Sequence, residues 1–393
     1  MRRVQLHDRV RLVALVMTLA GLALPSVVSG QLAVSSNDNK AVLVDGVNTV
    51  PPSPASDTVT IIDLGVSPPR VVGEVEVPGG WSAPPQSVAV APDESIALVA
   101  SSARIDPTDP TRTVTNNVLS VIDLRAMPPR VIDSLQTGRR AAGVSINPEG
   151  TLALVANRGD GTLSVFAISG TRVTPVSTVD LDAPDSEPSL PVFSPDGRTA
   201  YVTRNNDHRI SILSVDGQAV AYTGRDISAN LRPYSMELTP SGTVAIVGNI
   251  GNGPTGGADT ISVIDLEATP PRLVEAITVG LIPEGVAMSP DGQHVAVTVM
   301  NGSNLARTSP FANDFGLLKV FRLNGTTLAQ VAEARIGHWC QGVVWDRPGQ
   351  TLLVQCAADR EILVFNFDGR ALTRTTALPV SGAPTGIRTA VTR

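Results

Sequence analysis

Charged side chains in this 393-residue chain gather in the short segments that border its apolar runs. Eight of them could bind a ligand or assist a reaction: Arg139, Arg140, Arg158, Arg204, His208, Arg232, Glu284 and His338. A guanidinium group binds carboxylate or phosphate through two parallel hydrogen bonds, so these arginines could hold a small anion. Either histidine could act as a base or as a metal ligand.

The same residues have a purely structural alternative. The arginines could pair with nearby carboxylates, namely Asp160, Asp207, Asp359 and Glu284. Each histidine could be solvated or hydrogen-bonded without any chemical role. The chain also lacks the Gly-x-Ser-x-Gly and His-Glu-x-x-His motifs of common hydrolases, although active sites assembled from scattered repeats need no such motif. The sequence leaves both alternatives open.

A repeated unit must position these side chains. Its fullest copies lie at 285–299, 191–203 and 143–157, and each contains a short apolar strand, a tight turn and an alternating strand. The turn proline recurs at intervals of 45 to 57 residues, at Pro92, Pro148, Pro195, Pro240 and Pro290, with Arg347 in the matching place of a degenerate copy. A period of about 40 to 50 residues is typical of a β-propeller.

Each copy continues into a third and a fourth strand. The third strands include 60–64, 120–124 and 262–266, and each of these is followed by Pro-Pro-Arg, which marks the turn into the outermost strand. Seven units fit if residues 383–390 supply the innermost strand of the first one. We therefore predict an all-β, seven-bladed β-propeller, closed by a C-terminal strand that completes the first blade.

The repeats resemble the YVTN-type seven-bladed propeller family, which includes surface-layer-like proteins and propeller lactonases. The resemblance covers nearly all of residues 33–390 and is most specific at 154–166 and 194–203. It implies that a lactonase site would use an arginine, a glutamate and a histidine near the ring axis. In this chain Glu284 would be the base, Arg232 or Arg139 would hold the oxyanion or a carboxylate, and His338 would be a proton partner.

Four connections between second and third strands are unusually long: Gly46–Asp57, Ala103–Asn117, Ile250–Asp259 and Asn301–Phe315. In a propeller they emerge on the same face as the loops that lead into the innermost strands. We expect the functional surface on this face, unless the insertions are neutral.

The N-terminus predicts export. Residues 1–30 combine four arginines with the apolar run 12–24 and a small-residue end, which indicates a signal peptide before a single propeller domain at 31–393. We expect a periplasmic or secreted protein whose mature chain is not inserted in a membrane. A net charge of −6 argues against nucleic acid as a partner.

Two cysteines lie symmetrically about the turn at 346–349. Cys340 and Cys356 would face each other in an antiparallel hairpin, which predicts a structural disulfide, with free thiols as the alternative. The chain contains 3% aromatic residues and four histidines, so we expect no haem, copper or other cofactor. One carboxylate per Pro-Asp-Gly turn does not build a calcium shell either.

Two functions remain open from the sequence. The first is a non-catalytic binding or scaffold module that recognises a small anionic ligand or a protein partner through the long-loop face. The alternative is a lactonase-type hydrolase that opens a sugar-acid or related lactone at the channel mouth. A quinone-dependent dehydrogenase is disfavoured because the chain has three tryptophans, too few to dock its blades. Whether the protein is an enzyme is not decided at this level.

Overall fold

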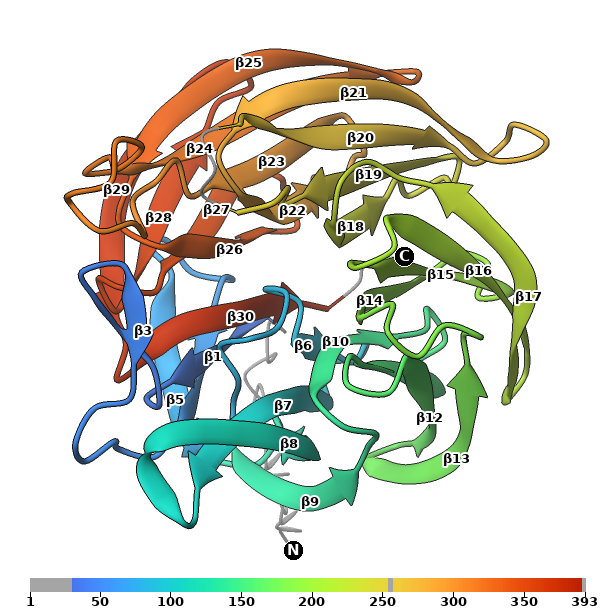
Figure 1. Cartoon of the computed structure of the whole chain (residues 1–393), viewed down its shortest axis with the longest axis horizontal. Coiled ribbons are helices and arrows are strands. Elements are labelled where there is room, and N and C mark those ends of the chain that lie inside the picture. Colours follow the sequence, from blue (N-terminus) through green and yellow to red (C-terminus); the bar gives the residue numbers. More distant parts are fainter. Residues whose placement is uncertain (1–29, 254–256, 391–393) are drawn as a thin grey trace, which may run out of the picture.

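Seven four-stranded antiparallel sheets are arranged around a central axis in the computed structural model (Figure 1). The structure describes residues 30–253 and 257–390. All regular elements in these ranges are β-strands. The described residues therefore contain no helix that is long and apolar enough to cross a membrane. The predicted signal peptide falls almost wholly on residues 1–29, which lie outside the described residues.

Each sheet is one blade, with its first strand nearest the axis and its fourth on the outer surface. From inside to outside, blade 1 contains β30 (Ala383–Thr389), β1 (Leu32–Asp38), β4 (Thr58–Asp63) and β5 (Arg70–Glu76). Blade 2 contains β6 (Val88–Val90), β7 (Ile96–Asp106), β8 (Asp109–Asp123) and β9 (Arg130–Gln136). Blade 3 contains β10 (Ala141–Ile146), β11 (Leu152–Asn157), β12 (Thr162–Ser169) and β13 (Arg172–Asp180). Blade 4 contains β14 (Pro188–Phe193), β15 (Thr199–Arg204), β16 (Arg209–Asp216) and β17 (Ala219–Ser228).

The last three blades follow the same order. Blade 5 contains β18 (Pro233–Leu238), β19 (Val244–Asn249), β20 (Asp259–Asp265) and β21 (Arg272–Gly280). Blade 6 contains β22 (Pro283–Met288), β23 (His294–Val299), β24 (Gly316–Asn324) and β25 (Thr327–Ile336). Blade 7 contains β26 (Cys340–Trp345), β27 (Thr351–Cys356), β28 (Glu361–Phe367) and β29 (Leu372–Pro379). The predicted seven-bladed propeller is confirmed.

The C-terminal strand closes the ring as predicted. β30 pairs antiparallel with β1, and Ala33 lies opposite Thr389 (Figure 1). β30 also contacts blade 2, because the Ile387 amide donates to the Pro85 carbonyl at 2.8 Å. Closure pairs the inner edge of blade 1, which would otherwise be an open template for aggregation.

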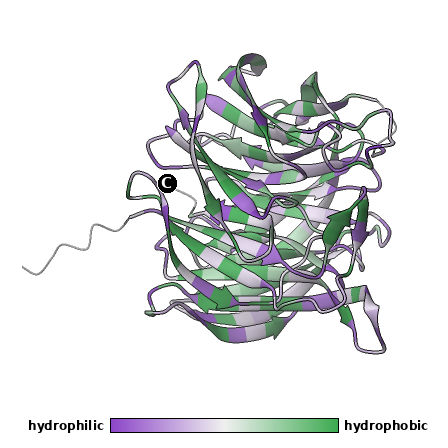
Figure 2. Cartoon of the chain, turned by 90° about the vertical axis from the view of Figure 1, so that its left-hand side faces the viewer, coloured by the Kyte–Doolittle hydropathy of each residue, from purple (hydrophilic) through white to green (hydrophobic). Residues whose placement is uncertain are grey.

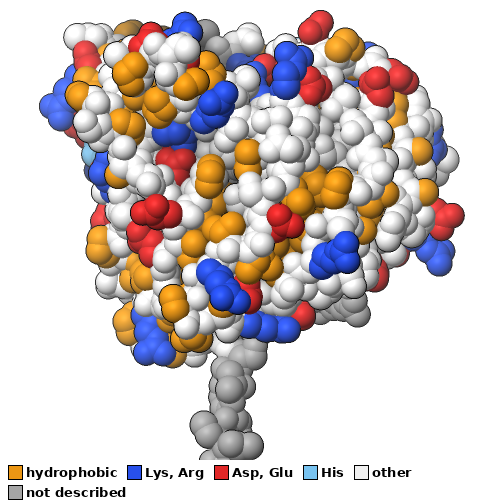
Figure 3. Space-filling model, turned by 90° about the horizontal axis from the view of Figure 1, so that it is seen from below, with side chains coloured by type: hydrophobic (Ala, Val, Ile, Leu, Met, Phe, Trp, Pro, Cys, Tyr) orange, Lys and Arg blue, Asp and Glu red, His pale blue; other side chains and the backbone are white. Residues whose placement is uncertain are grey.

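The core lies between the faces of neighbouring blades. The middle strands are buried on both faces, because each blade is packed between two neighbours, whereas residues of the outermost strands are mostly exposed. Figure 2 shows hydrophobic and hydrophilic residues interspersed along the strands. The largest fully buried side chains include Phe166, Phe321 and Phe365. On the flank shown in Figure 3, charges of both signs are scattered among apolar side chains. The interior therefore has the apolar layers that hold the inner strands in place.

Turns of one type join the first two strands of blades 2 to 7. Gly150 and Gly197 have φ values of +70° and +68°, the left-handed conformation that glycine adopts readily in the Pro-Glu-Gly and Pro-Asp-Gly turns. These turns lie at the end of the ring opposite the long loops. β5, β9 and β21 each begin at the arginine of a Pro-Pro-Arg segment, as expected.

The long loops are partly structured. Residues 103–117 continue β7 and β8 as an extended hairpin, and residues 46–57 include half of the small hairpin β2 (Val42–Val44) and β3 (Val47–Thr49). The 301–315 loop of blade 6 reaches this hairpin, where the Arg307 amide donates to Asp45 at 3.3 Å. Loops of blades 6 and 1 therefore meet although blade 7 lies between them.

Candidate functional site

The innermost strands carry one equivalent residue per blade, at the level of a bulge beside the ring axis. These residues, six positions before the turn proline or its equivalent, are Gln86, Ala142, Ser189, Tyr234, Glu284 and Gln341, and β30 supplies Thr385. In blades 3 to 7 the register between the first two strands shifts beside this position. A bulge of this kind re-aims side chains, which explains why a residue of an otherwise regular ladder can face the axis. We call this set the axial ring.

A second set of residues lies two positions earlier in the chain. Arg140, Glu187, Arg232, Ile282 and Trp339 all have left-handed backbones, with φ between +50° and +60°. Non-glycine residues rarely adopt this conformation, and five in equivalent positions indicate a repeated structural demand. Each of their carbonyls accepts a hydrogen bond from the residue that follows the second strand of its own blade. We call these five the leading residues.

Arg158 and Glu187 form the charged centre of the mouth. Glu187 bridges two arginines, because Arg140 Nη1 lies 2.8 Å from its Oε1 and Arg158 Nη2 lies 2.6 Å from its Oε2. Burial opposes ionisation of Glu187, but Arg158 and Arg140 outweigh it and lower its pKa. Arg158 is 5% exposed, and its guanidinium lies 5.5 Å from the centre of the Tyr234 ring. Blades 3, 4 and 5 therefore meet at this group.

Arg232 has a neutral partner. Its Nε and Nη2 donate to Asn205 Oδ1 at 3.1 and 2.9 Å, and Asn205 is fully buried. Within residues 30–253 and 257–390, Arg232 makes no ion pair. Arg140 and Arg158 pair with the ionised carboxylate Glu187, whereas Arg232 contacts no carboxylate among the described residues, so the three guanidinium groups leave an excess of positive charge at the mouth. A small anion would neutralise it.

Glu284 is the unusual member of the axial ring. It is 8% exposed, and its Oε2 has no hydrogen-bond partner among the described residues. Burial raises the pKa of Glu284 to about 8, although Arg158 and the Gln341 side chain oppose the shift. Tyr234 shares this environment: burial raises its pKa to about 12, Arg158 opposes the shift and Glu284 adds to it. A buried carboxyl beside a guanidinium, with one oxygen unused, is suited to general acid–base catalysis.

The structure divides the eight predicted residues into two groups. Arg140, Arg158, Arg232 and Glu284 come together at the mouth through the contacts described above. Arg139, Arg204 and His338 form other contacts, and His208 contacts the backbone of Arg232. The division arises because adjacent residues of one loop, such as Arg139 and Arg140, leave the backbone in different directions.

The remaining four have local partners. Arg139 is exposed on the rim, with its Nε 2.6 Å from Asp160 Oδ1. Arg204 is buried within blade 4 against Asp207 and Asp226. His208 accepts a hydrogen bond from the Arg232 amide at 3.2 Å.

His338 lies on the rim at blade 7. Its Nδ1 is 2.9 Å from Asp359 Oδ1, and its side chain is 43% exposed. Among the described residues no group of three or more His, Cys, Asp or Glu side chains could hold a metal ion.

Several residues of the mouth were not among the eight chosen from the sequence, namely Glu187, Asn205, Tyr234 and Gln341. Their shared distance from the turn proline could have identified Tyr234 and Gln341 beside Glu284. Only the folded ring shows that Asn205 faces Arg232.

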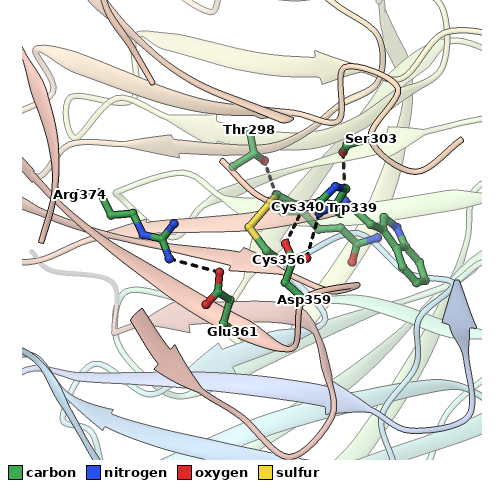
Figure 4. The surroundings of a disulfide bond; sticks show 10 residues. Thr298, Ser303, Trp339, Cys340, Cys356, Asp359, Glu361 and Arg374 are labelled. Carbon is green, nitrogen blue, oxygen red and sulfur yellow. Dashed lines mark hydrogen bonds and ion pairs between the residues drawn. A yellow bond between two sulfur atoms is a disulfide. The ribbon is translucent and has the colours of Figure 1, made fainter. Parts of the chain in front are cut away.

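The predicted disulfide is present at the edge of this site. Cys340 and Cys356 lie opposite each other in β26 and β27 and are joined by an S–S bond of 2.06 Å (Figure 4). Cys340 stands between the leading residue Trp339 and the axial residue Gln341. The amide of Trp339 also donates to Ser303 Oγ at 3.1 Å. The disulfide and this hydrogen bond fix the backbone that carries both residues.

The opposite face of the ring contains a separate cavity of about 480 Å³. Its lining comes from the ends of the inner strands near the turns and includes Val192, Trp345 and the ion pair between Glu237 and Arg388. This ion pair joins blade 5 to blade 1 across the axis.

Comparisons with known proteins agree with the fold. The model of the family described as "Lactonase, 7-bladed beta-propeller" matches residues 116–230, under a third of the chain. No curated protein sequence matches the chain.

Several solved structures share the architecture. A Bacteroides uniformis protein named as a candidate 6-phosphogluconolactonase is 18% identical, with a TM-score of 0.67 over 92% of this chain and 99% of that one. A Bacteroides fragilis protein with the same designation is 14% identical, with a TM-score of 0.68 over 93% and 100%. The periplasmic gluconolactonase of Pseudomonas aeruginosa is 14% identical, with a TM-score of 0.63 over 92% and 100%. At these identities the likeness concerns the fold.

Proposed function

We propose that this protein is a hydrolase that opens a small lactone bearing an anionic group. The observation that carries the proposal is Glu284, a buried carboxyl with an unused oxygen and a raised pKa beside the Arg158 guanidinium. Ring opening requires a base for the attacking water, a positive group for the carbonyl oxygen and a proton for the departing alkoxide. Glu284 and Arg158 can meet all three requirements.

The proposed reaction runs in two proton transfers. The Glu284 carboxylate removes a proton from water as the water oxygen bonds to the lactone carbonyl carbon, and Arg158 stabilises the resulting oxyanion. The ring C–O bond then breaks, and protonated Glu284 returns the proton to the alkoxide. The products are one hydroxy acid and the regenerated carboxylate.

The surplus positive charge determines the class of substrate. Arg140 and Arg232 border the mouth with only Glu187 to offset three guanidinium groups. A carboxylate or phosphate on the lactone would pair with them. In this assignment Arg158 holds the oxyanion, the role that the sequence suggested for Arg232 or Arg139. No role remains for His338, which contacts Asp359 on the rim.

The comparisons favour this hypothesis over a non-catalytic scaffold. The matched family segment contains Arg140, Arg158 and Glu187, and several fold neighbours carry lactonase names. Self-paired rim charges such as Arg139 with Asp160 would suit a scaffold equally well. Glu284 does not, because a buried carboxyl without a full set of partners destabilises a scaffold and brings it no benefit.

We also propose that the protein is exported and works in an oxidising compartment. The Cys340–Cys356 disulfide supports this location, since such bonds persist mainly outside the cytosol. One fold neighbour is named as periplasmic. Fractionation of the native host, with detection of the processed chain in the periplasm or medium, tests the location.

A hydrolysis assay tests the reaction. Proton release is followed at constant pH with sugar-acid lactones, carboxylated lactones and uncharged lactones, after subtraction of spontaneous opening. We expect turnover of an anionic lactone and a loss of about 10²–10⁴-fold in Glu284→Gln. Below about pH 8, kcat/KM should rise about tenfold per pH unit, because only the carboxylate is active.

The exposed rim variant Arg139→Gln is the matched control and should keep full activity. Binding of an anionic compound without turnover would support the scaffold hypothesis instead. Equal activity of the parent and Glu284→Gln would refute the assigned base.

A further inference from the structure

The residues around the mouth fall into a charged side and an apolar side. In blades 3, 4 and 5 the leading residues are charged, namely Arg140, Glu187 and Arg232. In blades 6 and 7 they are apolar, and the same position, two residues before the axial ring, is also apolar in blades 1 and 2: Ile282, Trp339, Ala383 and Pro84. These four residues are buried. Neighbouring blades therefore share one character, and the change occurs between blades 5 and 6 and between blades 2 and 3.

The apolar side is one continuous cluster of side chains. Its buried members include Ile282, Trp339 and Ala383. Four further side chains pack against them and keep part of their surface exposed, namely Leu43, Trp81, Ile250 and Leu281. We call this cluster the apolar arc. Exposed apolar surface bordered by charged groups is typical of a ligand-binding groove.

Both ends of the apolar arc contact the arginines of the mouth. At blade 2, Ser82, which follows Trp81, accepts a hydrogen bond from Arg140 Nη2 at 3.3 Å. At blade 5, the Ile250 amide donates to the Arg232 carbonyl at 3.1 Å. These two contacts place the apolar arc at the same level of the ring as the guanidinium groups. The two sides together surround the mouth.

Two of the long loops build the apolar arc. Leu43 belongs to the β2–β3 hairpin, and the tip of this hairpin packs closely on the 301–315 loop: a Cβ atom at Gly46 would collide with the Ala306 backbone nitrogen. Ser303 in the same loop accepts a hydrogen bond from the Trp339 amide at 3.1 Å. Leu43 of blade 1 and Trp339 of blade 7 share one cluster because these loops meet above them.

We propose that the apolar arc binds an alkyl or aryl substituent of the substrate, so that the preferred lactone is amphipathic, with an anionic group on the arginines and an apolar group opposite. The inference rests on the proposed function for its reaction, but the binding preference needs no turnover. Glu284 follows Ile282 by two positions, so the base lies beside the apolar arc. Hydroxyl groups of a sugar lactone would lose hydrogen bonds to water against this surface, which disfavours their binding.

A matched series of γ-lactones tests this preference. Each compound carries one ring carboxylate, and its second substituent is hydrogen, methyl, propyl or the polar 2,3-dihydroxypropyl group. Hydrolysis is followed at constant pH after subtraction of spontaneous opening. We expect kcat/KM to rise about fourfold for each carbon added up to propyl, the effect of one buried methylene group. The dihydroxypropyl compound should lose most of this gain.

Variants assign the preference to the apolar arc. Trp81→Ala and Leu43→Ala each remove apolar contact and should reduce the propyl-to-hydrogen ratio of kcat/KM by about fourfold or more. Val131→Ala is the matched control, because Val131 is an exposed valine in the outermost strand β9, and it should leave the ratio unchanged. Arg232→Gln should lower kcat/KM for every carboxylate of the series by one common factor. Two apolar variants keep the test available if one of them does not fold.

The outcomes separate this inference from the proposed function. The corresponding γ-lactams resist hydrolysis, and their binding is measured by thermal shift. Tighter binding of the propyl lactam that depends on Trp81, without turnover of any lactone, would uphold the apolar arc and reject the hydrolase. Turnover of sugar-acid lactones with no gain along the alkyl series would uphold the hydrolase and overturn this inference, and so would a gain that survives both Trp81→Ala and Leu43→Ala. Neither binding nor turnover would overturn both.

Discussion

Substitution of Glu284 by glutamine should stabilise the protein increasingly as the pH rises. The pKa of Glu284 is about 8 in the folded protein, against 4.5 as its ordinary value. Between these values the unfolded chain has released the proton and the folded chain retains it, so the parent loses stability with rising pH. The linkage relation gives a penalty of about 0.8 kcal/mol at pH 5 and about 3.3 kcal/mol at pH 7. Glutamine does not titrate, so the variant should gain about 2.5 kcal/mol over this interval.

Thermal unfolding of both proteins at several pH values measures this difference. For roughly 360 folded residues the entropy of unfolding is about 0.8 kcal/mol/K, so the difference in Tm should widen by about 3 °C from pH 5 to pH 7. Glu267→Gln removes one exposed carboxyl and should give a constant difference. A constant difference for Glu284→Gln as well would show that Glu284 ionises as an ordinary carboxyl, and the argument for a tuned base would fail.

Two further stability predictions concern the disulfide and a buried ion-pair cluster in blade 1, where Lys40 contacts the carboxylates of Asp38 and Asp57. Replacing both Cys340 and Cys356 by alanine removes a cross-link between residues 16 positions apart in the chain. The free energy of unfolding should fall by about 3 kcal/mol, measured by urea unfolding without reductant. An equal loss on adding reductant to the parent would agree, and no loss in either experiment would contradict a structural role. Lys40→Met leaves the buried carboxyls of Asp38 and Asp57 without their cation. The free energy of unfolding should fall by about 3–5 kcal/mol at neutral pH. The cost should shrink in acid as the carboxyls become protonated, and a cost independent of pH would disprove the ionic explanation.

The repeat pattern was sufficient to predict the architecture. Strand alternation, the turn proline and the Pro-Pro-Arg segments are local signals, and each blade repeats them, so single ambiguous copies are corrected by the others. The closing strand at 383–389 was predictable because it repeats the opening of a blade. The disulfide was predictable for a similar reason, since Cys340 and Cys356 are symmetric about one hairpin turn.

The site was predicted only in part. Arg140, Arg158, Arg232 and Glu284 were identified by type and loop position, but the same criteria also selected Arg139, Arg204, His208 and His338. Loop position does not reveal whether a side chain points to the axis or along the rim. That choice depends on the left-handed leading residues and on the bulges of the inner strands, which have no clear sequence signal.

By itself, the sequence determined the seven blades, their order and the hairpin disulfide, because these depend on patterns within about 50 residues. The tertiary structure alone decided which charges are paired and that burial raises the pKa of Glu284. Glu284 is 126 positions from Arg158 and 57 from Gln341 in the chain. They act on one another only because closure of the ring turns their strands toward a common axis and removes water from the space between them.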